Sequence, residues 1–128
     1  MKWSVNNEFS ILQIDHVQLA APKGSEDRAR HFFGDILGLK EIEKPEILKK
    51  RGGVWFLIGN QQLHIGIEEP FSPAKKAHPA FEIEQIEALK RHLTNNKIDY
   101  QVDHLLPGAN RIFLHDPFGN RIELLEWE

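Results

Sequence analysis

Apolar and polar side chains alternate along residues 11–21, and this alternation predicts a β-strand. Val17 and Leu19 lie on one face of the strand, while His16 and Gln18 lie on the other, because successive residues of a strand point to opposite sides. After a Pro-Lys-Gly break, the apolar residues recur at the spacing of an amphipathic helix. The first two predicted elements are therefore a strand and a helix.

The predicted helix has recognisable ends, and three further strands follow it. Ser25 is a suitable N-cap, and Gly38 comes just after the last apolar position, where a C-terminal glycine is common. The strands cover residues 39–44, 54–58 and 61–68, with a basic loop before the second and a Gly-Asn hairpin turn before the third. The inward side of the helix is formed by Ala29, Phe32, Phe33, Ile36 and Leu37.

A linker at residues 70–77 separates two halves that have the same order of elements. Such a repeat predicts one domain over residues 1–128 with two βαβββ modules, at about residues 9–69 and 78–127, and with residues 1–8 as a frayed lead-in. The fold class expected from this order is α+β. The elements of the second half are a strand at 78–83, a helix at 85–95 and strands at 100–106, 110–115 and 120–127.

Four side chains that can bind a metal occupy equivalent places in the two modules. His16 and His78 lie on the opening strands, and His64 and Glu123 lie on the closing hairpins. Their apolar neighbours would face the helices, so the four would share the opposite face and line one cavity if the modules pack as a pseudo-twofold pair. Imidazole and carboxylate groups suit Zn²⁺, Fe²⁺, Mn²⁺, Ni²⁺ or Co²⁺. We therefore expect one divalent transition metal bound by His16, His64, His78 and Glu123.

The first closing hairpin also brings an aromatic residue to the predicted site. Its two-residue Gly-Asn turn puts Trp55 opposite His64. Trp55 could stack on a planar substrate, or it could only fill the cavity wall. When the two hairpins are aligned, Trp55 matches Leu114, and Gln18 shares the face of the predicted ligands. The substrate-binding candidates are therefore Trp55, Gln18 and Leu114.

The composition narrows the possible classes of function. The chain has no cysteine, which excludes disulfides, thiolate metal sites and cysteine nucleophiles. Its net charge of −3 disfavours nucleic acid as a partner. The sequence has no apolar run of about 18 residues, and its first residues lack the apolar stretch of a signal peptide. We therefore expect a cytoplasmic protein that acts on a small molecule and has no membrane partner.

Four short motifs stand out along the chain, at residues 14–19, 32–39, 78–81 and 116–124. Together they resemble the vicinal oxygen chelate superfamily, which includes glyoxalase I, fosfomycin-resistance proteins, bleomycin-binding proteins and extradiol dioxygenases. The last motif is the most specific, because it resembles the turn before the terminal carboxylate ligand of that superfamily. The resemblance covers about residues 11–127 and implies a pseudo-twofold, partly closed mixed sheet with the helices on the outside.

The resemblance also has implications for the ligands. Dioxygenases and fosfomycin enzymes of the superfamily use two histidines and one glutamate, which His16, His78 and Glu123 match. His64 would then be a fourth ligand or a nearby acid–base group. Glyoxalase I enzymes usually carry a glutamate where this chain has His64, and this difference argues against a glutathione-dependent lactoylglutathione lyase. The catalytic candidates are His64 and Glu123.

These observations predict a metal-dependent enzyme that acts on a small substrate chelated through two adjacent oxygens. Lyase, isomerase, ring-cleaving and resistance-type reactions all stay open. One alternative is a non-catalytic protein that sequesters an antibiotic or a toxin, and another is a structural metalloprotein with four protein ligands. The resemblance further implies a homodimer, with the modules paired within one chain or swapped between two chains.

Overall fold

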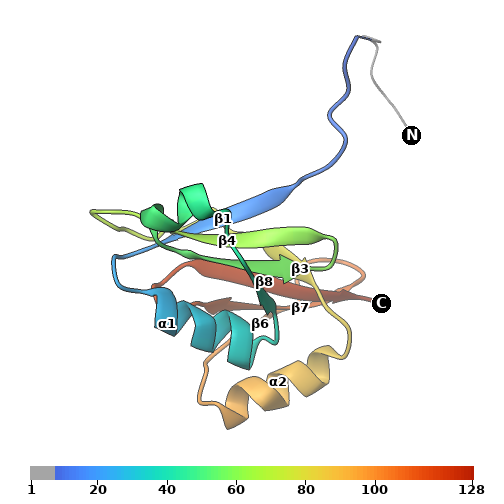
Figure 1. The fold of residues 1–128 in the computed structure, drawn as a ribbon. Helices are drawn as coiled ribbons and strands as arrows, with labels where there is room; N and C mark the ends of the chain where they lie inside the picture. Colours follow the sequence, from blue (N-terminus) through green and yellow to red (C-terminus); the bar gives the residue numbers. More distant parts are fainter. Residues whose placement is uncertain (1–7) are drawn as a thin grey trace.

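The protein consists of two four-stranded sheets and the helices that pack against them (Figure 1). The computed structural model describes residues 8–128, so all but the last residue of the predicted lead-in lies outside the described part. The first half contains β1 (His16–Ala21), α1 (Glu26–Ala29), η1 (Arg30–Ile36), β2 (Lys40–Ile42), η2 (Glu46–Arg51), β3 (Val54–Ile58) and β4 (Gln61–Ile67). The second half contains β5 (Ala80–Glu82), α2 (Ile86–Asn95), β6 (Gln101–Asp103), β7 (Ala109–His115) and β8 (Arg121–Trp127).

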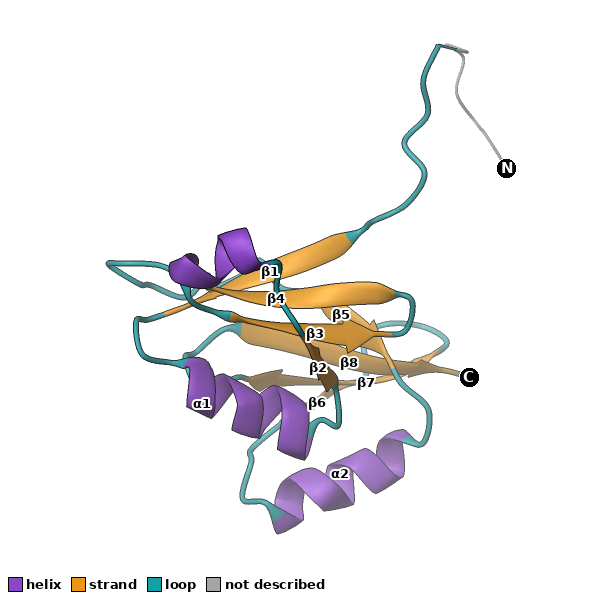
Figure 2. Ribbon diagram, in the orientation of Figure 1, coloured by secondary structure: helices purple, strands orange, loops and turns teal. Residues whose placement is uncertain are grey.

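The two sheets have the same topology. Their strand orders are β1-β4-β3-β2 and β5-β8-β7-β6. The pairs β1–β4 and β5–β8 are parallel, and the other pairs are antiparallel. The predicted α+β class and the repeated βαβββ order are thus confirmed, and the two sheets stay separate instead of closing into one. Figure 2 shows α1 and α2 on the same side of the molecule.

Several strands are shorter than the sequence pattern predicts. β1 begins at His16 and not at residue 11, because its neighbour β4 begins at Gln61 and pairs Gln62 with His16. An extended segment gains ladder hydrogen bonds only where another strand lies beside it. β5 is likewise limited to the three residues that face β8, and the predicted basic loop contains the helical turn η2.

The core lies between the helices and the sheets. Phe33 of η1 packs on Phe56 of β3, with their ring centroids 5.8 Å apart. Each fully buried side chain of this size contributes roughly 1.5–3 kcal/mol to stability. Asn120 Nδ2 donates to Ala20 O over 2.7 Å and links the two halves of the chain. Within residues 8–128, no helix has the length and apolarity that crossing a membrane requires. Other fully buried side chains are Leu63, Ile65, Ile86, Leu93, Ile112 and Ile122.

A carboxylate on α1 holds the loop that leads into β3. Glu26 Oε2 accepts a hydrogen bond from Gly53 N over 2.9 Å. This hydrogen bond lowers the pKa of the Glu26 carboxyl below its usual value of 4.5. Because the folded pKa lies below the unfolded one, the ionised carboxylate stabilises the fold above pH 4.5, and the contribution is lost as the pH falls through the folded pKa.

We expect Glu26→Gln to reduce the pH dependence of stability. Glutamine keeps an oxygen that can accept from Gly53 N–H, but it does not titrate. Urea unfolding at about pH 7 and about pH 3.5 should show a smaller loss of unfolding free energy in the variant than in the wild type. Glu84→Gln, at an exposed position, is the matched control and should follow the wild type. An unchanged pH dependence in Glu26→Gln would contradict the assigned role of the hydrogen bond.

Candidate functional site

His16 and His64 come together on the first sheet. β1 and β4 run parallel, and their register places Gln18 beside His64, with His16 two positions earlier. The rings of His16 and His64 stack with centroids 4.2 Å apart. Trp55 lies opposite His64 in the β3–β4 ladder, as the hairpin turn predicted, and its ring stacks on His64 at 3.8 Å. His64 is therefore a buried imidazole between Trp55 and His16.

His78 and Glu123 form the corresponding pair on the second sheet. Glu123 is buried on β8, and its backbone N–H donates to Pro79 O, next to His78. His78 Nε2 lies 2.9 Å from Glu123 Oε1. The other oxygen, Glu123 Oε2, accepts from Arg111 Nη1 over 3.3 Å, and Arg111 in turn donates to Asp103 Oδ1. Both oxygens of the Glu123 carboxylate are thereby oriented by neighbours.

The hydrogen bonds of His78 and His16 hold both imidazole rings in fixed orientations. His78 Nδ1 hydrogen-bonds Lys76 O over 2.9 Å, and His78 Nε2 hydrogen-bonds Glu123 Oε1, so the Nε2–carboxylate pair could exchange its shared proton for a cation. His16 Nδ1 lies 2.9 Å from Asp15 Oδ2 in a similar arrangement. Metal-binding histidines usually donate their second ring N–H to a carbonyl or carboxylate in this way.

His64 is held by a different partner. Its Nε2 lies 2.8 Å from Gln62 Oε1, which accepts a hydrogen bond from it. Burial lowers the pKa of His64 below its usual value, and repulsion from His16 lowers it further. The neutral imidazole favoured by these effects is the form that binds metals. Gln18 lies on the same face of the sheet, with its amide directly over Gly66.

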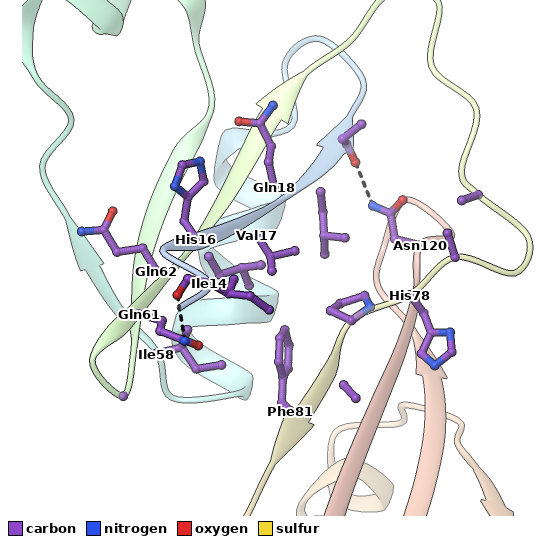
Figure 3. A pocket seen from close by; sticks show the side chains of 18 of the residues that line it. Ile14, His16, Val17, Gln18, Ile58, Gln61, Gln62, His78, Phe81 and Asn120 are labelled. Carbon is purple, nitrogen blue, oxygen red and sulfur yellow. Dashed lines mark hydrogen bonds between the residues drawn. The ribbon is translucent and has the colours of Figure 1, made fainter. Parts of the chain in front are cut away.

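The four predicted ligands do not meet within one chain. In the described part of the chain, no three histidine, aspartate or glutamate side chains form a group that could hold a metal ion. His16 and His78 border one cavity of ≈ 920 Å³, and Figure 3 shows their rings pointing away from each other. The imidazole and carboxylate donors fit a divalent transition metal, but each pair supplies only two ligands. The sequence left open whether one chain or two supply the four ligands, and the described residues of a single chain hold them as two separate pairs.

Leu114 does not lie where the sequence alignment of the hairpins placed it. Leu114 is 2% exposed and pairs with Ile122, while Phe113 pairs with Glu123. The predicted match assumed hairpins of equal length, but the second hairpin has a longer loop at residues 116–120 than the two-residue turn of the first. Phe113 is thus the counterpart of Trp55, and Leu114 is a core residue.

Sequence reasoning missed Phe113 and the cations around it. The Phe113 ring lies 5.4 Å from the ring of His78, and Arg111 and Arg121 stack on it at 5.0 and 4.3 Å. One sequence signal of the longer loop is Asp116, because an aspartate side chain often accepts hydrogen bonds from the backbone N–H groups of the residues that follow it in a turn. Its Oδ1 accepts from the backbone N–H of Phe118 and Asn120, which shapes the loop.

This repeated βαβββ fold, with paired imidazole and carboxylate donors at equivalent strand positions, defines a protein of the glyoxalase-like class. A family model described as the Glyoxalase/Bleomycin resistance protein/Dioxygenase superfamily matches residues 13–124. The chain belongs to this superfamily, and the resemblance stated from its sequence motifs is confirmed.

Individual relatives agree with this assignment. The crystal structure of a glyoxalase family protein from Bacillus anthracis is 52% identical, with a TM-score of 0.92, over 94% of this chain and 98% of that one. Glyoxylase I 4 of Arabidopsis thaliana is 27% identical over an alignment of 135 positions, which covers 97% of this chain and 76% of the relative. A fosfomycin resistance protein from Listeria monocytogenes, 16% identical over 92% of this chain and 95% of its own, has a TM-score of 0.75 and shows the shared fold alone.

Proposed function

We propose that the protein is a metal-dependent enzyme of the glyoxalase type whose metal centre is completed by a second copy of the chain. His16 and His64 would come from one copy, and His78 and Glu123 from the other. The observation that carries the proposal is the hydrogen bonding of His78. Its Nδ1 donates to the Lys76 carbonyl, and its Nε2 hydrogen-bonds Glu123 Oε1 over 2.9 Å, so a metal ion could replace the proton that these two groups share.

A second copy is required because each sheet offers only two ligands. In a twofold dimer, each pair meets the complementary pair of the other copy, so two equal centres form. Three or four nitrogen and oxygen ligands then surround each ion, which is the number that catalytic metal sites use. This proposal selects the swapped arrangement of modules between two chains over pairing within one chain.

The walls around the two pairs suit a small, partly apolar substrate. Trp55 and Phe113 flank the donors with aromatic faces. Arg111 fixes Glu123 Oε2 and leaves Oε1 directed at His78. The bound metal would act as a Lewis acid on two adjacent substrate oxygens and stabilise negative charge there. Because His64 stands where glyoxalase I enzymes usually carry a glutamate, the proposed substrate is not a glutathione adduct.

Metal analysis of the wild-type protein tests this function. The protein, purified without chelators and incubated with Zn²⁺, Mn²⁺, Fe²⁺, Co²⁺ and Ni²⁺ in turn, should retain about one ion per chain with at least one of these metals. The loaded protein should then turn over one of a set of small substrates with adjacent oxygens, such as catechols or 2-oxoaldehydes. Failure to retain any of the metals would contradict the proposal and favour a sequestering protein.

A further inference from the structure

The segment before β1 is an apolar arm. Residues 9–15, here named the N-terminal arm, extend away from the two sheets (Figure 1). Gln61 Nε2 donates to Ile14 O over 2.8 Å and anchors the base of the arm. Contiguous exposed apolar surface on a soluble protein usually marks an interaction site. The exposed fractions of its apolar residues are 64% for Phe9, 90% for Ile11, 83% for Leu12 and 63% for Ile14.

A groove between the two sheets is lined by apolar side chains, as the N-terminal arm is. β1 and β5 are edge strands of their sheets, and the ≈ 920 Å³ cavity lies between them. Figure 3 shows the side chains of Val17 and Phe81 directed into this space. Edge strands carry unpaired backbone donors and acceptors with which an extended segment can pair. The apolar lining of this β1–β5 groove includes Ile14, Val17, Leu19, Ile58 and Phe81.

We propose that the N-terminal arm of one copy binds in the β1–β5 groove of a second copy, and that two copies exchange arms reciprocally. In an extended arm, Phe9 and Ile11 point to one side, while Leu12 and Ile14 point to the other. A strand that is apolar on both faces is suited to burial on both sides. Ile14 already borders the groove of its own chain, and the rest of the arm leads away from the two sheets, where it could reach a second copy.

This inference goes beyond the proposed function because arm exchange needs no metal. It gives the dimer an interface of its own, formed by side chains that one chain leaves exposed. A twofold axis makes the two exchanged contacts identical, so every change in the arm acts twice in each dimer.

Leu12→Asp tests the contact, with Thr94→Asp, exposed on α2, as a control that adds the same charge outside the arm. Burying one leucine favours binding by at least about tenfold, so the loss of two should raise the dimer dissociation constant about a hundredfold. Sedimentation equilibrium of the full-length chains measures this constant, and circular dichroism checks that both variants fold. Equal constants for the two variants, or a wild-type protein that stays monomeric, would overturn the proposal.

Crosslinking tests the location of the arm, because the natural chain has no cysteine. A Leu12→Cys chain is mixed with a tagged Asn60→Cys chain, since Asn60 lines the groove, and a short bismaleimide is added. A crosslinked pair of tagged and untagged chains is expected. Thr94→Cys, exposed on α2, replaces Asn60→Cys in the control and should give no such pair. Crosslinking only within single chains that carry both Leu12→Cys and Asn60→Cys would overturn the exchange.

Metal content measured on the same samples separates this inference from the proposed function. A wild-type dimer that dissociates with Leu12→Asp and yet retains no metal would defeat the proposed function and support arm exchange. A metal-loaded dimer that is insensitive to Leu12→Asp would overturn arm exchange and leave the metal centre in place.

Discussion

Replacing Glu123 with glutamine is expected to lower the affinity for the divalent metal by more than about a hundredfold and to abolish turnover. Glu123 is the only carboxylate among the four proposed ligands, and it is buried and held by Arg111 and His78. Changing a residue that only supports a ligand costs about 10–100-fold in metal affinity, so loss of the ligand itself should cost more. Glutamine has nearly the same shape but carries no negative charge to balance the cation.

Isothermal titration with the metal that binds the wild type most tightly measures this loss. Glu84→Gln removes the same charge from an exposed position and should bind the metal like the wild type. Urea unfolding of the metal-free proteins shows whether Glu123→Gln still folds. Wild-type metal affinity in a folded Glu123→Gln variant would remove Glu123 from the ligand set.

Gly53→Ala is expected to destabilise the fold by about 3 kcal/mol or more, the largest stability effect among the proposed substitutions. Gly53 has φ +89°, in the left-handed region that disfavours side chains. A Cβ at this position would lie 2.2 Å from Ile65 O. Ile65 pairs with Val54, the next residue, so the clash can be relieved only by moving the β3–β4 ladder that carries Trp55 and His64.

Gly24→Ala is the matched control for this prediction. Gly24 has φ +81°, but no atom would lie within 4 Å of a methyl group added there, so only the backbone strain of about 1 kcal/mol applies. Urea unfolding at neutral pH measures both variants. Similar losses of unfolding free energy in Gly24→Ala and Gly53→Ala would show that the clash with Ile65 O adds nothing to the cost of replacing Gly53.

The positions that could be predicted from the sequence depend on short-range geometry. Strand parity together with a two-residue turn placed Trp55 opposite His64, because no other register is compatible with that turn. The same reasoning failed for Leu114, because the loop at residues 116–120 is longer and shifts the pairing by one residue. A shift of one residue exchanges the two faces of a strand, so Phe113 replaced Leu114 at the site.

The arrangement of the two pairs in space could not be predicted from the sequence. The alternation of side chains along a strand puts His16 and His78 on defined faces of their own sheets, but it does not determine how the two sheets pack against each other. The sheets remain separate, and the two rings point away from each other across the cavity. Residues 11–15 could not be predicted for a similar reason. Their alternating pattern predicts a strand, but β4 has no residues beside them to pair with.

Subunit mixing tests whether the metal centre is shared between two copies of the chain. One chain carries His16→Ala with His64→Ala, and the other carries His78→Ala with Glu123→Gln, so neither can form a centre alone. If the centre is shared, each mixed dimer contains one centre with all four natural ligands and one with none. Random exchange makes about half of the dimers mixed, so about a quarter of the wild-type metal content should return.

The measurement is metal content per chain, by elemental analysis, after the two variants are unfolded together, refolded and dialysed against the metal. We expect almost no metal in either variant alone and about a quarter of the wild-type content in the refolded mixture. A mixture that binds no more metal than the separate variants, while the wild type treated in the same way binds about one ion per chain, would contradict a shared centre.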